Sequence, residues 1–255
     1  KKGLRTGLLP STVGSASEGT IIPEGTEFQV NTYIDDWLNY PDISSLADGG
    51  FVVAWDLASS SIYAQIYNAD GTTRGGEFQV NTHRDDWNRF PSTAPLSDGG
   101  FVITWQSDGQ DGYEYGIYAQ MYNADGTTKN EEFRVNTNTT YDQTVPSIAS
   151  CSNGGFVITW QSNEQDGDQE GIYAQMYNAD GTTRGGEFQV NTYTDVMQKS
   201  PSISSLTDGG FIITWQSYGQ EGSSSYGPYG QRFDADGNKI NLYQGPLIIL
   251  NIDQS

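Results

Sequence analysis

The chain has 255 residues, of which 35% are hydrophobic and 17% charged, and its formal net charge is −20 at pH 7. An acidic surface of this kind repels nucleic acid and anionic membranes, which leaves cations, particularly Ca²⁺, and neutral glycans as compatible partners. No apolar run approaches the ~20 residues that a membrane-spanning helix needs, so we expect a soluble protein without membrane insertion.

Residues 1–24 precede a repeat that fills residues 25–244, and an apolar tail follows at residues 245–255. Three landmarks recur in constant order: the Phe of "EFQV" or "EFRV", the Trp of "GGFVITW" and the Tyr of "IYAQ". The Phe positions are separated by 50, 55 and 55 residues, and the Trp positions by the same intervals; these are Phe28, Phe78, Phe133 and Phe188, followed by Trp55, Trp105, Trp160 and Trp215. A fixed period of this length indicates one supersecondary unit built four times.

Each copy contains four short runs that read as strands. In the second copy, residues 91–96 lead through an Asp-Gly-Gly turn into residues 100–105. A variable loop then leads to residues 116–123, and a glycine-containing turn leads to residues 132–137. Asp-Gly between apolar runs is a strong hairpin signal, and both faces of residues 100–105 are apolar. Four-stranded antiparallel units covered on both faces predict an all-β, four-bladed β-propeller; the alternative is an open linear or helical array of the same units.

The segment "GGFVITWQSDGQDGYEYGIYAQMYNADGTT…EFRVNT" resembles the tandem repeats of large secreted bacterial surface and adhesin-like proteins, over about residues 25–240. The resemblance implies an extracellular or cell-surface setting. The turn after the third strand also resembles, loosely, the Asp-box turn of sialidase propellers. The Asp-box spacing is not matched, so no sialidase residue is assigned.

The sequence gives little support for catalysis. A glycosidase needs two carboxylates on facing elements, and the acidic residues here lie in repeated loops and turns with no distinctive pair. His83 occupies a variable loop position, and Cys151, the single cysteine, reads as a buried or inert thiol. We therefore expect a non-catalytic structural or adhesive protein; the alternative is a multivalent carbohydrate-binding lectin.

Two aromatic residues are candidate ligand platforms. The four repeated tryptophans read as core, because they end strands that are apolar on both faces. Trp37 and Trp87 instead lie in the polar crossings between copies, where they are either ligand contacts or local packing plugs. The predicted ligand-binding residues are these two and the acids beside them: Asp35, Asp36, Trp37, Asp85, Asp86 and Trp87.

Acidic loops and turns are candidate Ca²⁺ sites. The loops after the repeated Trp and the final "DADGNK" turn carry closely spaced oxygen ligands. The predicted metal ligands are Asp108, Asp111, Asp166, Asp168, Asp234 and Asp236. For the "NADG" and "DADG" turns, an Asx-type turn without metal is the competing interpretation.

The ends of the chain suggest assembly. "TEFQV" at Thr26 is a fifth copy of the fourth strand, so one strand is surplus to four blades. Since a spare apolar strand can pair with a neighbour, we expect a homo-oligomer or head-to-tail filament through residues 3–13 or 245–252. Asn138 begins the one N-glycosylation sequon, usable only if the source makes N-glycans.

Overall fold

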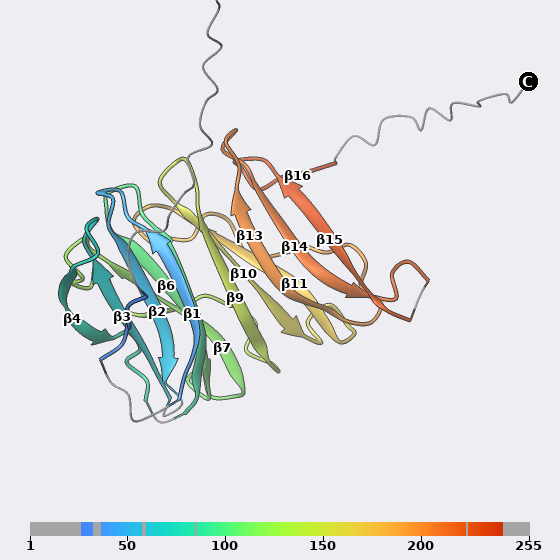
Figure 1. The fold of residues 1–255 in the computed structure, drawn as a ribbon. Coiled ribbons are helices and arrows are strands. Elements are labelled where there is room, and N and C mark those ends of the chain that lie inside the picture. The colour runs from blue at the N-terminus through green and yellow to red at the C-terminus, as the bar shows by residue number, and fades with distance from the viewer. Residues whose placement is uncertain (1–26, 33–36, 58–59, 85, 223, 242–255) are drawn as a thin grey trace, which may run out of the picture.

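The structure is a computed structural model, and it describes residues 27–32, 37–57, 60–84, 86–222 and 224–241. These residues form four four-stranded antiparallel sheets, each in simple sequential order (Figure 1). The predicted all-β class and the four blades of a propeller are therefore confirmed. Within the described residues, no helix is long and apolar enough to cross a membrane.

The sheets are named blades 1 to 4 in chain order. Blade 1 contains β1 (Leu38–Ser45), β2 (Phe51–Leu57), β3 (Ser61–Tyr67) and β4 (Thr73–Gln79). Blade 2 contains β5 (Asn88–Pro95), β6 (Phe101–Asp108), β7 (Tyr115–Tyr122) and β8 (Phe133–Arg134). Blade 3 contains β9 (Gln143–Ser150), β10 (Phe156–Asn163), β11 (Glu170–Tyr177) and β12 (Phe188–Gln189). Blade 4 contains β13 (Gln198–Ser205), β14 (Phe211–Tyr218), β15 (Tyr226–Phe233) and β16 (Lys239–Ile240).

The turn between the first two strands of each blade explains its repeated Asp-Gly-Gly or Asn-Gly-Gly sequence. In blade 2, the Asp98 carboxylate accepts the Gly100 N–H at 3.1 Å, and Gly99 has φ 91°, a conformation that L side chains rarely adopt. A Cβ at Gly100 would overlap the Tyr122 carbonyl oxygen. The two glycines therefore have separate causes, one in backbone conformation and one in close packing.

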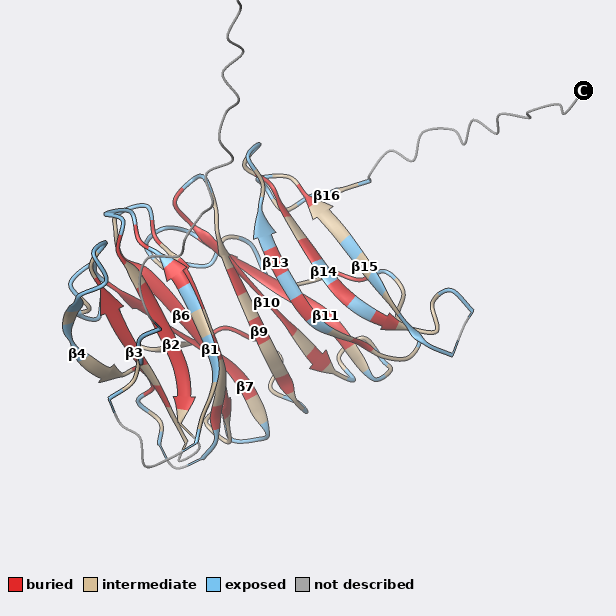
Figure 2. Ribbon diagram, in the orientation of Figure 1, coloured by how far each residue is buried: buried red, intermediate tan, exposed pale blue. Residues whose placement is uncertain are grey.

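Apolar cores lie between consecutive blades. Trp105 packs in the core between blades 1 and 2, Trp160 in that between blades 2 and 3, and Trp215 in that between blades 3 and 4. Trp105 and Trp160 are 0% exposed, while Trp55 and Trp215 are 5% and 7% exposed, so the four repeated tryptophans are core residues as predicted. Figure 2 shows the corresponding burial along β2, β3, β6 and β11.

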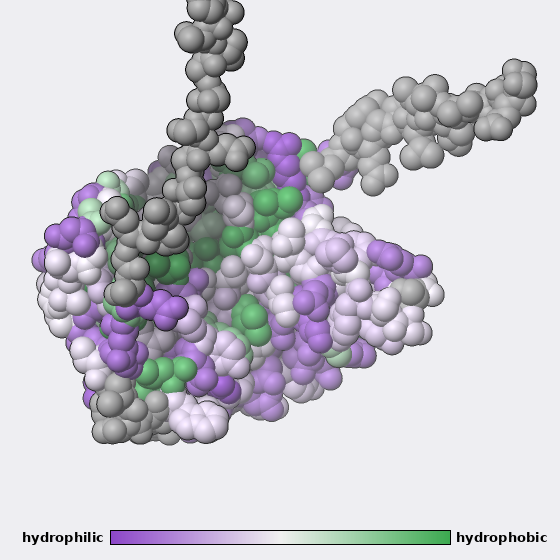
Figure 3. Space-filling model, in the orientation of Figure 1, coloured by the Kyte–Doolittle hydropathy of each residue, from purple (hydrophilic) through white to green (hydrophobic). Residues whose placement is uncertain are grey.

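The blades are stacked in series. Among the described residues, no apolar core cluster joins blade 1 to blade 4. A further cluster, around Trp55, lies on the outer face of blade 1. In the view of Figure 3, apolar side chains line a hollow between the first and last blades, and the flanks are mostly hydrophilic.

The first strand of every blade carries a bulge, and these strands contact one another in series. At each bulge a residue other than glycine has positive φ and precedes a proline: Tyr40, Phe90, Val145 and Ser200. The amides of Val145 and Ser200 are held by Gln106 and Gln161 of the preceding blade, at 3.0 and 2.9 Å. A bulge of this kind redirects side chains, and strained backbone is often found at functional sites.

Candidate functional site

The repeat provides an internal control for locating a site, because residues needed for the fold recur and residues needed for a ligand need not. At the start of the first strand the copies carry different side chains at aligned positions. Strand registers align Asn39, Arg89, Thr144 and Lys199 with one another, and align Asp56 with Gln106, Gln161 and Gln216. Arg89 and Asp56 are therefore departures from the repeat, and both lie at the junction of blades 1 and 2.

Arg89 is surrounded by aromatic rings. Its guanidinium carbon lies 5.3 Å from the ring centre of Tyr40 and 5.5 Å from the rings of Trp87 and Phe90. The rings of Tyr40 and Phe90 are 4.1 Å apart. Tyr40 is 45% exposed and Trp87 is 48% exposed, so their rings are accessible to a ligand. The guanidinium of Arg89 orients these rings by cation–π contacts.

The buried carboxylate of Asp56 compensates the positive charge of Arg89. Its carboxylate oxygen lies 3.6 Å from Arg89 Nε, and the residue is 2% exposed. Burial raises the pKa of Asp56, while Arg89, the Phe90 amide and the Asn39 side chain act in the opposite direction. Within the described part of the chain, neither carboxylate oxygen of Asp56 makes a hydrogen bond of ordinary geometry, so Arg89 is the principal compensating group.

A second carboxyl group, that of Asp108, also has an unusual environment. Burial raises the pKa of Asp108 above its ordinary value, and repulsion from Asp86 and Asp142 raises it further. Asp142 accepts the Tyr115 N–H at 3.3 Å. The pKa of Tyr115 is raised by burial and by Asp108, whereas Arg89 opposes this shift. Tyr115 therefore lies within electrostatic reach of Arg89, and the backbone N–H of Asp108 donates to the Trp87 carbonyl oxygen at 2.8 Å.

We call Tyr40, Asp56, Trp87, Arg89, Phe90 and Asp108 the rim cluster. It combines exposed aromatic faces, one cation and two carboxyl groups, Asp56 and Asp108, whose pKa values are raised by burial. Such a combination can stack against a sugar ring and supply a proton to a leaving oxygen.

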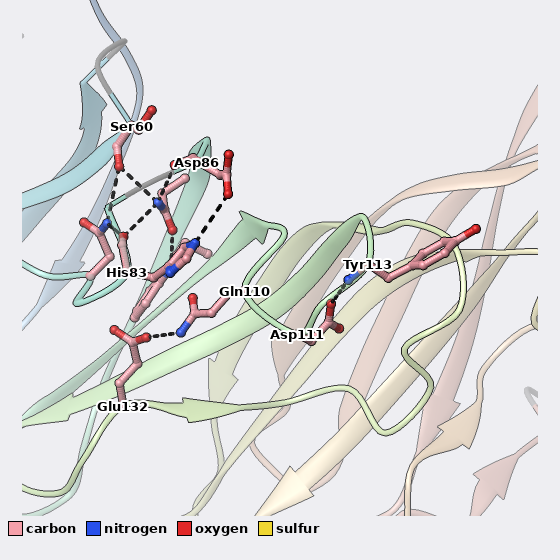
Figure 4. A network of polar contacts seen from close by, with 10 residues as sticks. Ser60, His83, Asp86, Gln110, Asp111, Tyr113 and Glu132 are labelled. Carbon is pink, nitrogen blue, oxygen red and sulfur yellow. Dashed lines mark hydrogen bonds and ion pairs between the residues drawn. The ribbon is translucent and has the colours of Figure 1, made fainter.

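A polar network fixes the crossing that carries Trp87 (Figure 4). The Asn88 side-chain amide donates to the carbonyl oxygens of Ser60, His83 and Asp86 at 3.0, 3.1 and 3.0 Å. Asn88 Oδ1 accepts the Trp105 indole N–H at 3.1 Å. The core tryptophan is thus linked through Asn88 to the crossing that carries Trp87.

Other contacts in the network set the neighbouring loops. Glu132 accepts the Gln110 side-chain amide at 2.6 Å and the Thr82 backbone N–H at 2.7 Å. His83 Nε2 lies 3.7 Å from Asp86 Oδ2. His83 therefore belongs to the crossing, as the sequence indicated.

The structure joins part of the predicted ligand site to residues that sequence reasoning missed. Trp87 lies in the rim cluster, and Asp86 acts electrostatically on its Asp108. Trp37 is 81% exposed at the edge of blade 1. Asp35, Asp36 and Asp85 lie outside the described residues. The missed residues were detectable as departures from the repeat at aligned positions, Asp in place of Gln and Arg in place of Asn, Thr or Lys.

Most predicted metal ligands have other contacts. Asp166 accepts Gln189 and Asn191, Asp168 accepts the Val196 N–H, Asp234 accepts the N–H groups of Asp236 and Asn238, and Asp236 pairs with Arg184. Asp111 lies against Gly116 and Tyr118, and Asp108 belongs to the rim cluster. Over the part of the chain that the structure describes, no three His, Cys, Asp or Glu side chains come together to hold a metal ion. Asp234 forms the Asx-type turn that was the competing interpretation.

Cys151 and Asn138 lie apart from the rim cluster in sequence, and the structure gives their local surroundings. Cys151 is a free, partly buried thiol whose pKa is raised by burial. Asn138 is partly buried and its Oδ1 accepts the Thr140 N–H at 3.1 Å. The proposed assembly segments, residues 3–13 and 245–252, lie outside the described residues.

No family model matches the sequence, and no curated protein matches it. Among solved structures, the chain is similar to a Dyadobacter fermentans protein of unknown function (12% identity, TM-score 0.60, 78% of this chain and 66% of that one). It is also similar to the Hadza microbial sialidase Hz136, with 9% identity and a TM-score of 0.58 over 78% of this chain and 45% of that one. An endo-arabinase from Bacteroides thetaiotaomicron has 14% identity and a TM-score of 0.50 over 87% of this chain and 82% of that one. The chain spans less than two thirds of the first two proteins. At these identities the likeness shows the fold alone.

The comparison corrects the functional expectation. A non-catalytic structural or adhesive protein was predicted because repeated acidic loops offered no distinctive pair of carboxylates. That conclusion was wrong: the solved structures with this fold include a sialidase and an arabinase. Repeat architecture therefore gives no ground for excluding catalysis, and carboxylates distant in sequence are brought together at the rim.

Proposed function

We propose that the protein is a carbohydrate-active propeller that binds a glycan at the rim cluster and hydrolyses a glycosidic bond there. The observation that carries the proposal is the environment of Arg89, which contacts three aromatic rings and Asp56 in the same place. Exposed aromatic rings bind the apolar faces of sugars, and adjacent charged groups bind hydroxyl groups. The sialidase and arabinase that share the fold support this assignment of class.

Asp108 is the proposed proton donor. Its raised pKa favours the protonated carboxyl group that must give a proton to the glycosidic oxygen as the C–O bond breaks. Asp142 is the proposed base, because its carboxylate is oriented by the Tyr115 N–H. It would take a proton from the water that attacks the anomeric carbon. The anomeric carbon then gains the hydroxyl group of the water, and the leaving oxygen gains the proton from Asp108.

The test is release of reducing ends from a panel of neutral polysaccharides and sialosides. We expect Asp108→Asn and Asp142→Asn to abolish release while binding persists. Glu131→Gln is the matched control, because Glu131 is an exposed acid in the β7–β8 turn and its loss changes the net charge equally. Binding without cleavage by the natural protein would reject hydrolysis; no binding at all would reject the proposal.

A further inference from the structure

Residues 27–32 lie on the outer face of blade 1 in the manner of the fourth strand of a preceding blade. The ring centres of Phe28 and Tyr67 are 5.6 Å apart. The corresponding pairs across the three blade junctions are separated by 5.3, 5.5 and 5.5 Å: Phe78–Tyr122, Phe133–Tyr177 and Phe188–Phe233.

Hydrogen bonds repeat the same correspondence. The Thr32 N–H donates to Glu77 at 2.5 Å, as Thr82 donates to Glu132 at 2.7 Å and Thr137 to Glu187 at 2.6 Å. The Tyr67 hydroxyl donates to the Val30 carbonyl at 3.0 Å, as Tyr122 does to Val80 at 3.5 Å. Residues 27–32 therefore occupy the place that the fourth strand of a preceding blade would take, although they form no strand within a sheet.

Among the residues that the structure describes, blade 1 lacks the other contacts that a blade receives from its predecessor. Gly126, Gly181 and Gly237 each lie under an aliphatic or methionine side chain of the preceding blade, from Ile66, Met121 and Met176 respectively. At the aligned Gly71, no atom of the described part of the chain lies within 4 Å of the position where a Cβ would be. Ile43 is 62% exposed, whereas the aligned Ile148 and Ile203 are 7% and 9% exposed.

Apolar hollows flank Trp55 on this face. One, of 530 Å³, is lined by Leu38, Trp55, Leu57 and Tyr63 with Thr32 and Glu77. The other, of 250 Å³, is lined by Val30, Pro41, Val53 and Trp55 among others. The face thus keeps the residue types of an interior blade junction without the close packing of one.

The opposite end of the stack differs. Each blade turns one face toward the next blade in the chain. On this face the third strand of blades 1 to 3 carries Ile, then Ala, then Ile or Met. A Lys or Arg follows the turn after that strand. Blade 4 replaces these four groups with Pro228, Gly230, Arg232 and Ile240. The cations of blades 1 to 3 donate to the Ala124, Ala179 and Ala235 carbonyls of the following blade. Blade 4 thus has the sequence of a terminal blade.

We propose that the outer face of blade 1 accepts a further repeat blade, of which residues 27–32 form the last strand. The partner must present an aliphatic face of the interior type, as blade 2 does with Ile117, Ala119 and Met121. Blade 4 of the same or a second copy is a poor fit, because Arg232 would replace the methionine that covers the aligned glycine. The two ends of the stack therefore differ: blade 1 presents an acceptor face and blade 4 presents a terminal face.

The first experiment inserts a duplicate of residues 83–131 directly before Glu27, so that it leads into residues 27–30 as residue 131 leads into Glu132. We expect a higher Tm and slower amide exchange in β2 and β3 than in the natural chain. The control insert carries Ala119→Gly and Met121→Arg, copied from blade 4, and should give little of this protection. Equal protection from both inserts, or none from either, would overturn the proposal.

The second measurement uses the natural chain and does not depend on folding of the insert. An apolar fluorescent dye should bind a monomeric protein, and Ile43→Lys should abolish binding while the matched Ile212→Lys, on blade 4, does not. A dimer that dissociates on Ile43→Lys would show that a second copy occupies the face. Absence of dye binding to the monomer would show that the face is already covered by the chain itself. Either result would overturn the proposal.

Discussion

Arg89 Nε lies 3.6 Å from the carboxylate of Asp56, across the junction between blades 1 and 2. At the same position of the next junction, the residues are Thr144 and Gln106, so a charged pair has replaced a neutral one. Opposite charges at a junction stabilise it only while both are present, because each compensates the other in a poorly solvated place.

Arg89→Met should therefore lower the free energy of unfolding by about 2–3 kcal/mol, less than for a fully buried pair because Arg89 is partly exposed. The double variant Asp56→Gln with Arg89→Thr copies the neutral pair and should recover most of the loss. Urea titration of the three proteins measures this. A double variant as unstable as Arg89→Met would show that the pair is not energetically coupled.

Asp108 and Asp98 should respond to pH with opposite signs. The pKa of Asp108 is raised by burial, so its ionisation destabilises the native state as pH rises through the unfolded value toward the folded one. The pKa of Asp98 is lowered, first by its hydrogen bond with Lys129, so its stabilisation is present above the unfolded pKa and is lost as pH falls through the folded one.

It follows that Asp108→Asn should not destabilise the protein at pH 7 and should abolish hydrolysis, whereas Asp98→Asn should lower stability at pH 7 and leave hydrolysis intact. Thermal unfolding between pH 2.5 and 7 checks both signs. Loss of stability on Asp108→Asn would indicate a structural carboxylate in place of a functional one.

Trp105 and Trp160 are equally buried but differ in one hydrogen bond. The Trp105 indole donates to Asn88, whereas the Trp160 indole nitrogen has no hydrogen-bond partner among the described residues. Truncation of either to Ala should cost about 3–5 kcal/mol. Trp105→Phe should cost about 1 kcal/mol more than Trp160→Phe, because Asn88 then keeps an unpaired oxygen. Chemical denaturation measures the difference; equal costs would contradict the role of the indole N–H.

The fold was accessible from the sequence because its signals are local and repeated. The turn before Gly100 and the alternation through Trp105 predict a hairpin within each copy, and four copies predict four blades. The first strands were placed too short, since β1 begins at Leu38 and continues through the bulge at Tyr40. Positive φ before proline is unfavourable locally and is stabilised by contacts from another blade, which no local pattern encodes.

The site was only half accessible for a related reason. Trp87 was identified as an aromatic residue that the fold did not require. Asp56 and Arg89 are 33 residues apart and belong to different copies, so their proximity follows from the packing of blades and not from spacing within a repeat. Comparing aligned positions across copies would have separated both from the scaffold.

Trp87 and Trp37 occupy the same position in consecutive copies, but the structure distinguishes them. Trp87 packs beside Arg89 with its face partly open, and Trp37 is 81% exposed. A ring already oriented by a cation loses less freedom when a sugar stacks on it. Trp87→Ala should therefore weaken glycan binding by about tenfold, equivalent to about 1.4 kcal/mol, and Trp37→Ala should weaken it less. Titration calorimetry with a ligand found in the hydrolysis panel, supported by unfolding curves to show that both variants are folded, measures the two effects. If Trp37→Ala has the larger effect, the binding surface centres on blade 1 and the rim cluster is not its principal contact.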